Sequence, residues 1–227
     1  MHLILLAIAP VIIILFYIYW RDKYEKEPFY LLARGLLFGV ISVLPVTLVE
    51  GVLMMFGPLF TGYWNTFYQA FVVAGATEEG FKFLASFILV WHSREFNQRF
   101  DGIVYAVFVS MGFALVENLL YVFSSPDGLS VGLTRALTAV PAHAMFGVLM
   151  GFHLSLAKFY PQARRLFLGY AFLIPFTFHG LYDFILMSGN QILLALFVPF
   201  IIYMVFRVHR RMKLLSDADN LIHNGQE

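Results

Sequence analysis

The stretch GATEEGFKFL, residues 75–84, carries three charged side chains, those of Glu78, Glu79 and Lys82. It lies in an apolar run, from about residue 65 to residue 91, that is long enough to cross a bilayer as a helix, which takes about 20 residues. A charged group in hydrocarbon costs about 2.5–3.5 kcal/mol on insertion scales. These side chains must therefore face protein or water, and the stretch predicts a polar site inside a membrane protein.

The composition of the whole chain also indicates a membrane protein. Of its 227 residues, 60% are hydrophobic and 13% are charged, and the mean hydropathy is +0.78, whereas soluble domains have about 25% charged residues. The net charge is +1 and there is no basic tail or patch, so we expect no nucleic acid as a partner. Cysteine is absent, which excludes a disulfide framework, a cysteine zinc site and a thiol nucleophile.

We predict an all-α fold, a polytopic transmembrane bundle of about seven helices. Positive charges follow the first apolar run instead of preceding it, so we expect an uncleaved helix there and not a signal peptide. The short connections favour a single transmembrane domain over residues 1–213, followed by a short, loosely ordered cytoplasmic tail at 214–227. The predicted spans are about 3–20, 31–56, 66–91, 102–123, 133–157, 165–187 and 190–208.

Lysine and arginine alternate between successive connections. The loops after the first, third and fifth spans and the C-terminus are basic, whereas the loops after the second, fourth and sixth spans contain no lysine or arginine. Because basic loops stay in the cytoplasm, we predict that the N-terminus lies outside and the C-terminus in the cytoplasm.

Several ionisable residues fall inside the predicted spans. Counted at 1.5 Å per residue, most of them lie in the outer half of the membrane, which predicts a water-filled pocket open to the outside. Each must meet another polar group or water, since charges in lipid are costly. They are Glu50, Glu78, Glu79, Lys82, Glu117, Arg135 and Asp183, together with His143, His153 and His179.

Helical spacing brings some of these groups together. Lys82 is four residues from Glu78 and three from Glu79, so it can pair with either carboxylate, and we expect it to be their fixed counter-ion. Asp183 is four residues after His179 and can orient its imidazole. Glu50 can be a partner of Arg135 or a buried, hydrogen-bonded acid, and spacing does not separate these alternatives.

The cluster favours water-activating chemistry. A glutamate in such a pocket can act as general base for attack on a carbonyl, and a neighbouring histidine can stabilise the oxyanion or protonate the leaving amine. No G-x-S-x-G or H-E-x-x-H motif is present in a span. We expect no cofactor; a metal ion stays an alternative, and its ligands would be Glu78, Glu117, His143 and His179.

Four places in the sequence resemble the PrsW family of intramembrane proteases, within the glutamic CAAX-endopeptidase/Abi superfamily. Each motif is short, but the ordered set, one on each of four successive predicted spans, is fairly specific and covers about half the chain. The motifs are Glu78-Glu79-x-x-Lys82, Phe113-x-x-x-Glu117-Asn118, His143 in PAHAMFG and His179-x-x-x-Asp183.

The resemblance implies a multi-pass protease of the bacterial cell membrane. Its substrate would be a single-span anti-sigma factor of the RsiW type, in which it would make the first, site-one cut within the lipid bilayer. The resemblance also implies that the first motif activates water, that Glu117 is a second activating residue, and that His179 and Asp183 stabilise the oxyanion. Lys82, His143 and Asn118 would support them.

This sequence departs from the prenyl-endopeptidase branch of the superfamily at three positions. That branch has His in place of Glu117, Asn in place of Asp183, and Arg one residue beyond the position of Lys82. An aspartate donates a hydrogen bond only when protonated, so we expect Asp183 to orient His179.

Two alternatives come from other classes of protein. A proton-coupled transporter can use a buried Glu/His cluster as a relay, but no inverted repeat is visible in the sequence. A retinal protein needs a lysine in the last span, and there is none at 190–208.

Overall fold

Apolar runs alternate with short polar connections along this chain, and nearly every run folds into a helix in the computed structural model, which describes residues 2–224. No β-strand occurs within that range, so the predicted all-α bundle is confirmed. The α-helices are α1 (His2–Arg21), α2 (Phe29–Met54), α3 (Tyr63–Phe67), α4 (Thr77–Val90), α5 (Asp101–Ser124), α6 (Gly128–Leu137), α7 (Ala139–Phe159), α8 (Arg164–Met187) and α9 (Gln191–Asn224). The 3₁₀ helices are η1 (Gly57–Leu59) and η3 (Pro161–Ala163), and η2 (Tyr68–Ala76) is a π-helix.

The helices long and apolar enough to cross a membrane number six among the described residues, one fewer than the seven predicted spans. The predicted span 66–91 is the exception. It forms the helical run α3–η2–α4, and its longest α-helical piece, α4, has 14 residues and carries Glu78, Glu79 and Lys82. The six are His2–Arg21, Phe29–Leu59, Asp101–Ser124, Gly128–Phe159, Pro161–Met187 and Gln191–Asn224.

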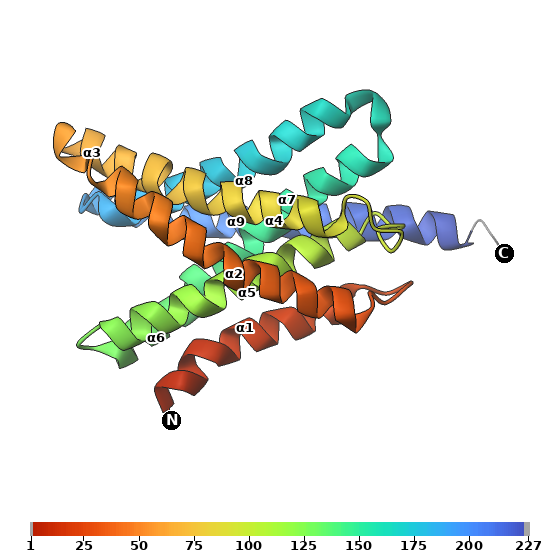
Figure 1. Cartoon of the computed structure of the whole chain (residues 1–227), viewed down its shortest axis with the longest axis horizontal. Coiled ribbons are helices and arrows are strands. Elements are labelled where there is room, and N and C mark those ends of the chain that lie inside the picture. Colours follow the sequence, from red (N-terminus) through yellow and green to blue (C-terminus); the bar gives the residue numbers. More distant parts are fainter. Residues whose placement is uncertain (1, 225–227) are drawn as a thin grey trace.

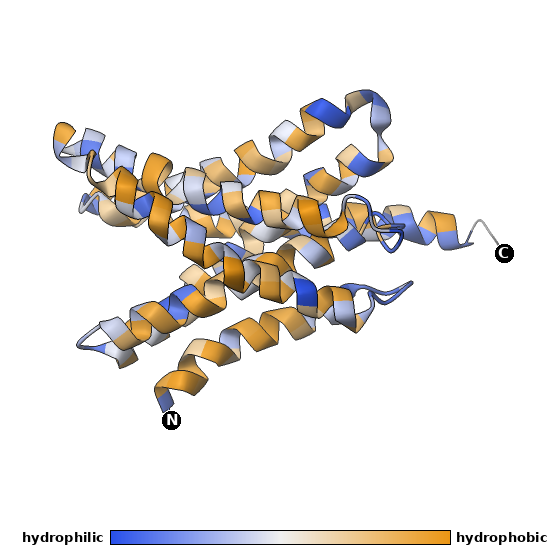
Figure 2. Ribbon diagram, viewed as in Figure 1, coloured by the Kyte–Doolittle hydropathy of each residue, from blue (hydrophilic) through white to orange (hydrophobic). Residues whose placement is uncertain are grey.

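Helices α5 and α7 form the centre of the bundle (Figure 1). The most apolar stretches of Asp101–Ser124 and of Gly128–Phe159 are each 72% buried, against 17% for α1 and 11% for α9. Helix α1 is apolar along most of its length (Figure 2), and side chains such as Ile13 and Phe16 are exposed. Glycines let the central helices touch. A Cβ on Gly39 of α2 would lie 2.0 Å from the carbonyl oxygen of Val109, and one on Gly151 of α7 would lie 2.2 Å from that of Gly102. Gly39 and Gly151 each belong to a pair of glycines four residues apart, with Gly35 and Gly147, and this small-residue spacing serves helix packing.

The basic loops gather at one end of the bundle. The connections 22–28, 91–100 and 160–163 lie at the end where α9 finishes, and we call this the basic end (Figure 1). The connections at 55–62, 125–127 and 188–190 lie at the opposite end, where α1 begins (Figure 1). The basic loops thus lie together at one end of the bundle, and the loops without lysine or arginine lie together at the other. The orientation of the bundle in the membrane stays a prediction.

Two segments differ from the sequence-based expectations. The predicted span 133–157 is broken at Thr138, because Pro141 has no N–H to donate to the carbonyl of residue 137. Residues 214–224 are wrongly predicted as a loosely ordered tail: α9 continues through them, and Asp219 accepts backbone hydrogen bonds from Arg99 (3.0 Å) and Phe100 (2.8 Å). Residues 225–227 lie outside the described part.

Candidate active site

A π-helix directly precedes the first motif. The wider turn of η2 ends at Ala76, and Glu78 and Glu79 begin the regular helix α4. Such π segments are frequent at functional sites. Helix α8 packs against η2. A Cβ on Gly75 would lie 3.3 Å from the amide nitrogen of Gly180, which is next to His179. Because neither glycine has a side chain, η2 and α8 can approach closely at this point.

Lys82 is fully buried and its ammonium lies between three acceptors. Its Nζ is 3.0 Å from Oε2 of Glu78, 2.9 Å from Oε1 of Glu79 and 3.0 Å from Nδ1 of His143. An ammonium has no lone pair, so Nδ1 of His143 accepts this hydrogen bond. The predicted pairing of Lys82 with both glutamates is confirmed, and the structure adds His143, from α7, as its third partner.

The tautomer of His143 follows from that contact. Since Nδ1 accepts from Lys82, a neutral ring carries its proton on Nε2, which lies 2.8 Å from Oε2 of Glu117 and donates to it. The same oxygen accepts from the guanidinium of Arg135 at 2.7 Å. Glu117 is thereby fixed from two sides.

Arg135 links helix α6 to this cluster. Besides its contact with Glu117, its Nε donates to Oδ1 of Asn118 (3.0 Å), and the guanidinium lies 4.0 Å from the ring centroid of Tyr121. Asn118 in turn donates to the carbonyl of Ala7 in α1 (2.9 Å). Asn118 is therefore a structural link between α1, α5 and α6. Arg135 pairs with Glu117, and no hydrogen bond or ion pair joins it to Glu50 in the described chain.

His179 contacts carboxylates through both ring nitrogens. Its Nδ1 lies 2.9 Å from Oε1 of Glu79, and its Nε2 lies 3.4 Å from Oδ2 of Asp183 and 3.9 Å from Oε2 of Glu78. An ionised carboxylate only accepts, so Nδ1–H donates to Glu79. Phe146 stacks on the ring with centroids 4.9 Å apart. The sequence predicted Asp183 as the residue that orients His179; the structure adds Glu79 as a second and closer partner.

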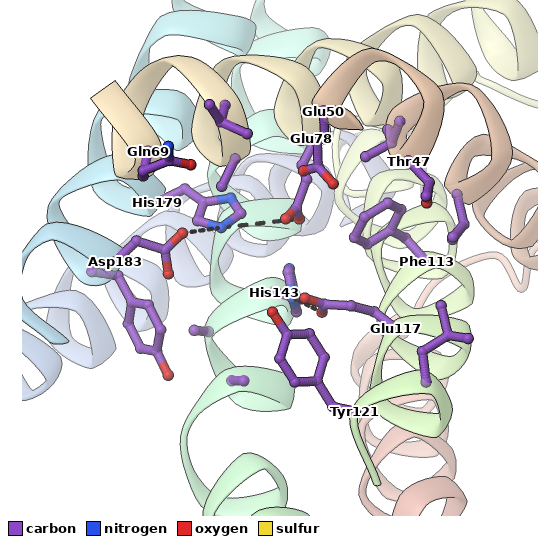
Figure 3. A pocket seen from close by; sticks show the side chains of 18 of the residues that line it. Thr47, Glu50, Gln69, Glu78, Phe113, Glu117, Tyr121, His143, His179 and Asp183 are labelled. Carbon is purple, nitrogen blue, oxygen red and sulfur yellow. Dashed lines mark hydrogen bonds and ion pairs between the residues drawn. The ribbon is translucent and has the colours of Figure 1, made fainter. Parts of the chain in front are cut away.

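These groups surround one cavity of about 240 Å³ (Figure 3). Of the adjacent glutamates, Glu78 belongs to its wall, whereas Glu79 and Lys82 are buried behind it. Glu50 points into the cavity from α2 (Figure 3) and has no hydrogen-bond partner in the described chain. Met54, Tyr121 and Met187, near the opposite end from the basic loops, also line it. The acidic, basic and histidine residues of the wall are Glu50, Glu78, Glu117, Arg135, His143, His179 and Asp183.

The eight residues to which the family resemblance gave a role thus lie in one connected cluster. They are Glu78, Glu79, Lys82, Glu117, Asn118, His143, His179 and Asp183. Sequence reasoning considered Arg135 as a partner of Glu50, and it missed the pairing of Arg135 with Glu117 and the roles of Phe146 and Tyr121. Phe146 is three residues after His143, so helical spacing already placed it on the same face. Tyr121 is four residues after Glu117, so helical spacing likewise placed it on the same face.

Comparisons with known proteins agree on one family. The family model described as "PrsW family intramembrane metalloprotease" matches residues 27–208. The chain is 39% identical over 206 residues to Protease PrsW of Clostridioides difficile (strain 630), covering 89% of this chain and 86% of that protein. It is 36% identical over 200 residues to Protease PrsW of Bacillus subtilis (strain 168), covering 87% and 88%. No solved structure matches the chain.

The word metalloprotease in that description can be tested against the donor atoms. Within residues 2–224, one group of metal-ligating side chains has donor atoms within 4.8 Å of one another, that of Glu78, Glu79 and His143. Zinc would lie about 2.0–2.2 Å from such nitrogen and oxygen atoms. The Lys82 ammonium already contacts all three donors, at 3.0, 2.9 and 3.0 Å. The group in this arrangement does not fit a metal ion.

The ligand set expected from the sequence is arranged differently. Both ring nitrogens of His143 have partners, Lys82 and Glu117, and both ring nitrogens of His179 face carboxylates. The group whose donor atoms lie close enough together for a metal ion contains Glu79 in addition to Glu78 and His143. Glu117 and His179, which the sequence suggested as ligands, are not in it.

Proposed function

The chain belongs to the PrsW family of intramembrane proteases, and from this premise we propose that it makes the first cut in a single-span anti-sigma factor of the RsiW type, with Glu78 activating the attacking water. Family membership decides against the proton-coupled transporter. It also makes the protein a hydrolase of the bacterial membrane, and six of its described helices are long and apolar enough to cross that membrane.

One geometric observation carries the proposed mechanism. Oε2 of Glu78 and Nε2 of His179 are 3.9 Å apart, too far for a direct hydrogen bond, and both residues line the cavity. A water molecule can bridge atoms at this separation. Lys82 holds Oε2 of Glu78, which leaves Oε1 of that carboxylate free of protein partners in the described chain.

The reaction then proceeds by general-base catalysis. Glu78 takes a proton from the water, whose oxygen forms a bond to the carbonyl carbon of the substrate. In this scheme the resulting oxyanion is stabilised by donors on the cavity wall, and His179 and Arg135, which line it, are the groups we propose. The C–N bond breaks, and the proton held by Glu78 passes to the leaving amine.

Each remaining polar residue has a positioning role in this scheme. Glu79 and Asp183 hold the imidazole of His179, as Glu117 and Lys82 hold that of His143. Glu117 would act as the second carboxylate of the cavity. Fixed donors of this kind stabilise a developing charge without reorganising during the reaction.

The position of the cavity supports a cut on the external side. Its wall reaches the end opposite the basic loops, and the positive-inside rule assigns basic loops to the cytoplasm. A single-span substrate would meet such a cavity with its external juxtamembrane segment. A prenylated cytoplasmic C-terminus would approach from the other side.

The test is a cleavage assay with purified protein in detergent and a single-span anti-sigma factor of the RsiW type. The variants are Glu78→Gln, Glu79→Gln and His179→Ala, with Asp217→Asn, an exposed acid on α9, as the control. We expect Glu78→Gln to lower the rate by at least about 100-fold and the control to cleave as wild type does. If all three site variants cleave normally, the protein does not use this cluster for proteolysis.

A further inference from the structure

A buried amine occupies the place where three metal-ligating side chains converge. The carboxylates come from neighbouring residues of α4, Glu78 and Glu79, and the imidazole comes from His143 of α7. The Nζ of Lys82 is within hydrogen-bond distance of a donor atom from each, and its side chain is 0% exposed. An ammonium has three N–H groups, and each of them has one partner here.

The same three atoms make a chemically suitable set for a divalent cation. Two carboxylate oxygens and one imidazole nitrogen are donors that Zn²⁺ and Mn²⁺ accept. A second oxygen of Glu79, Oε2, is buried without a hydrogen-bond partner. An ion and the amine cannot share the position, because the ion would lie in contact with a fixed positive charge.

A further contact holds the amine where it is. The ring of Phe113, from α5, lies under the ammonium with its centroid 4.2 Å from Nζ, an arrangement that attracts a cation. The lysine therefore has three acceptors and one aromatic face. Lys82 is fully buried and is not among the residues that line the cavity.

We infer that the ammonium of Lys82 replaces a divalent metal ion in the group formed by Glu78, Glu79 and His143, so that the protein excludes metal from this group and gains a metal site when the amine is removed. A protein that excludes metal from this group would differ from the metalloprotease named in the description of the family. The inference concerns metal content and not cleavage, so it stands or falls independently of the proposed substrate and mechanism.

The experiment compares wild type with Lys82→Ala, which opens the position, and Lys82→Arg, which keeps a cation there. Each protein is purified without a histidine tag, treated with EDTA, incubated with Zn²⁺ and desalted, and the bound zinc is measured by mass spectrometry. We expect about one equivalent of zinc on Lys82→Ala and none above background on wild type or Lys82→Arg. Thermal unfolding provides a second readout, because zinc should raise the melting temperature of Lys82→Ala alone.

Two further variants identify the ligands. Adding Glu79→Gln or His143→Ala to Lys82→Ala should abolish the zinc binding and the shift in melting temperature. The inference is overturned if wild type retains one equivalent of zinc, and if Glu79→Gln or His143→Ala, introduced alone into wild type, removes that zinc. It is also overturned if folded Lys82→Ala binds no more zinc than wild type.

Where Lys82→Ala does not yield folded protein, the wild-type measurement still decides. Zinc or manganese bound to wild type in a manner that depends on Glu79 and His143 contradicts the inference. Wild type that stays free of both ions, with an unchanged melting temperature, supports it.

Discussion

Nδ1 of His179 lies 2.9 Å from Oε1 of Glu79, although the two residues are 100 positions apart in the chain. This contact connects α8 to α4 and makes the second glutamate of the pair the support of a histidine. The first glutamate, Glu78, belongs to the cavity wall instead. Two adjacent residues of the same type therefore face different surroundings.

The glutamate pair should respond unequally to the same substitution. We expect Glu78→Gln to lower the cleavage rate by at least about 100-fold. The reduction for Glu79→Gln should be about ten times smaller, because the amide oxygen of the new glutamine still accepts the hydrogen bond from His179. The measurement is kcat and KM for a single-span substrate at one detergent concentration. A larger loss for Glu79→Gln would assign the role of base to Glu79, and equal losses would contradict the expected difference between the two glutamates.

Replacing Lys82 by methionine should harm folding more than chemistry. The substitution leaves the carboxylates of Glu78 and Glu79 without their shared cation, and breaking a buried ion pair on one side costs about 3–5 kcal/mol. We expect a low yield of monodisperse protein and a reduced melting temperature in detergent. Normal yield and stability with lost turnover would instead assign Lys82 a direct part in the reaction.

A single methyl group at Gly180 should displace the π-helix. A Cβ there would lie 2.3 Å from the ring of Phe71, and overpacking of this kind typically costs about 1–3 kcal/mol. We expect Gly180→Ala to lower both the melting temperature and the cleavage rate, because η2 positions Glu78. Gly169→Ala is the matched control, since a Cβ at that position of α8 meets nothing within 4 Å.

A second substitution, at Phe71, should relieve the clash that Gly180→Ala creates. The atoms that a Cβ on Gly180 would meet first all belong to the ring of Phe71. Combining Gly180→Ala with Phe71→Leu should restore part of the lost stability, measured as a non-additive double-mutant cycle. Strict additivity would mean that Gly180 acts through another contact.

Asp22, in the connection between α1 and α2, should make stability depend on pH. Burial raises the pKa of Asp22 to about 6, although nearby Lys26 acts in the opposite direction. A raised pKa means that the folded state holds the proton more tightly than the unfolded state. The stability linked to that proton is present below the unfolded-state pKa of 3.8 and is lost as the pH rises through about 6.

Asp22→Asn, which cannot ionise, should therefore stabilise the protein at pH 7.5, by about 1–3 kcal/mol. The gain should shrink as the pH is lowered from 6 to 4. Melting temperatures of wild type and variant across this range test the expectation, with the exposed Asp217→Asn as control. A gain that does not change with pH would mean that the carboxyl of Asp22 is not the cause.

Much of the architecture follows from hydropathy alone. Helices of about 20 apolar residues and loops with alternating charge are local properties of the sequence. The run 66–91 shows the limit of this approach. Its length predicts one regular span, but the π-helix η2 depends on how closely Gly75 and Gly180 let two helices approach, which no local pattern records.

The sequence by itself determined that this is a helical membrane protein and that its buried acids and histidines form a site, because charges in lipid must find partners and helical spacing groups neighbours on one face. Tertiary structure alone decided which partner each group has: that His179 is held by Glu79, that Lys82 reaches His143, and that Arg135 pairs with Glu117. The physical reason is that contacts between helices depend on crossing geometry and close packing. Residues 61 or 100 positions apart meet only after the helices have packed.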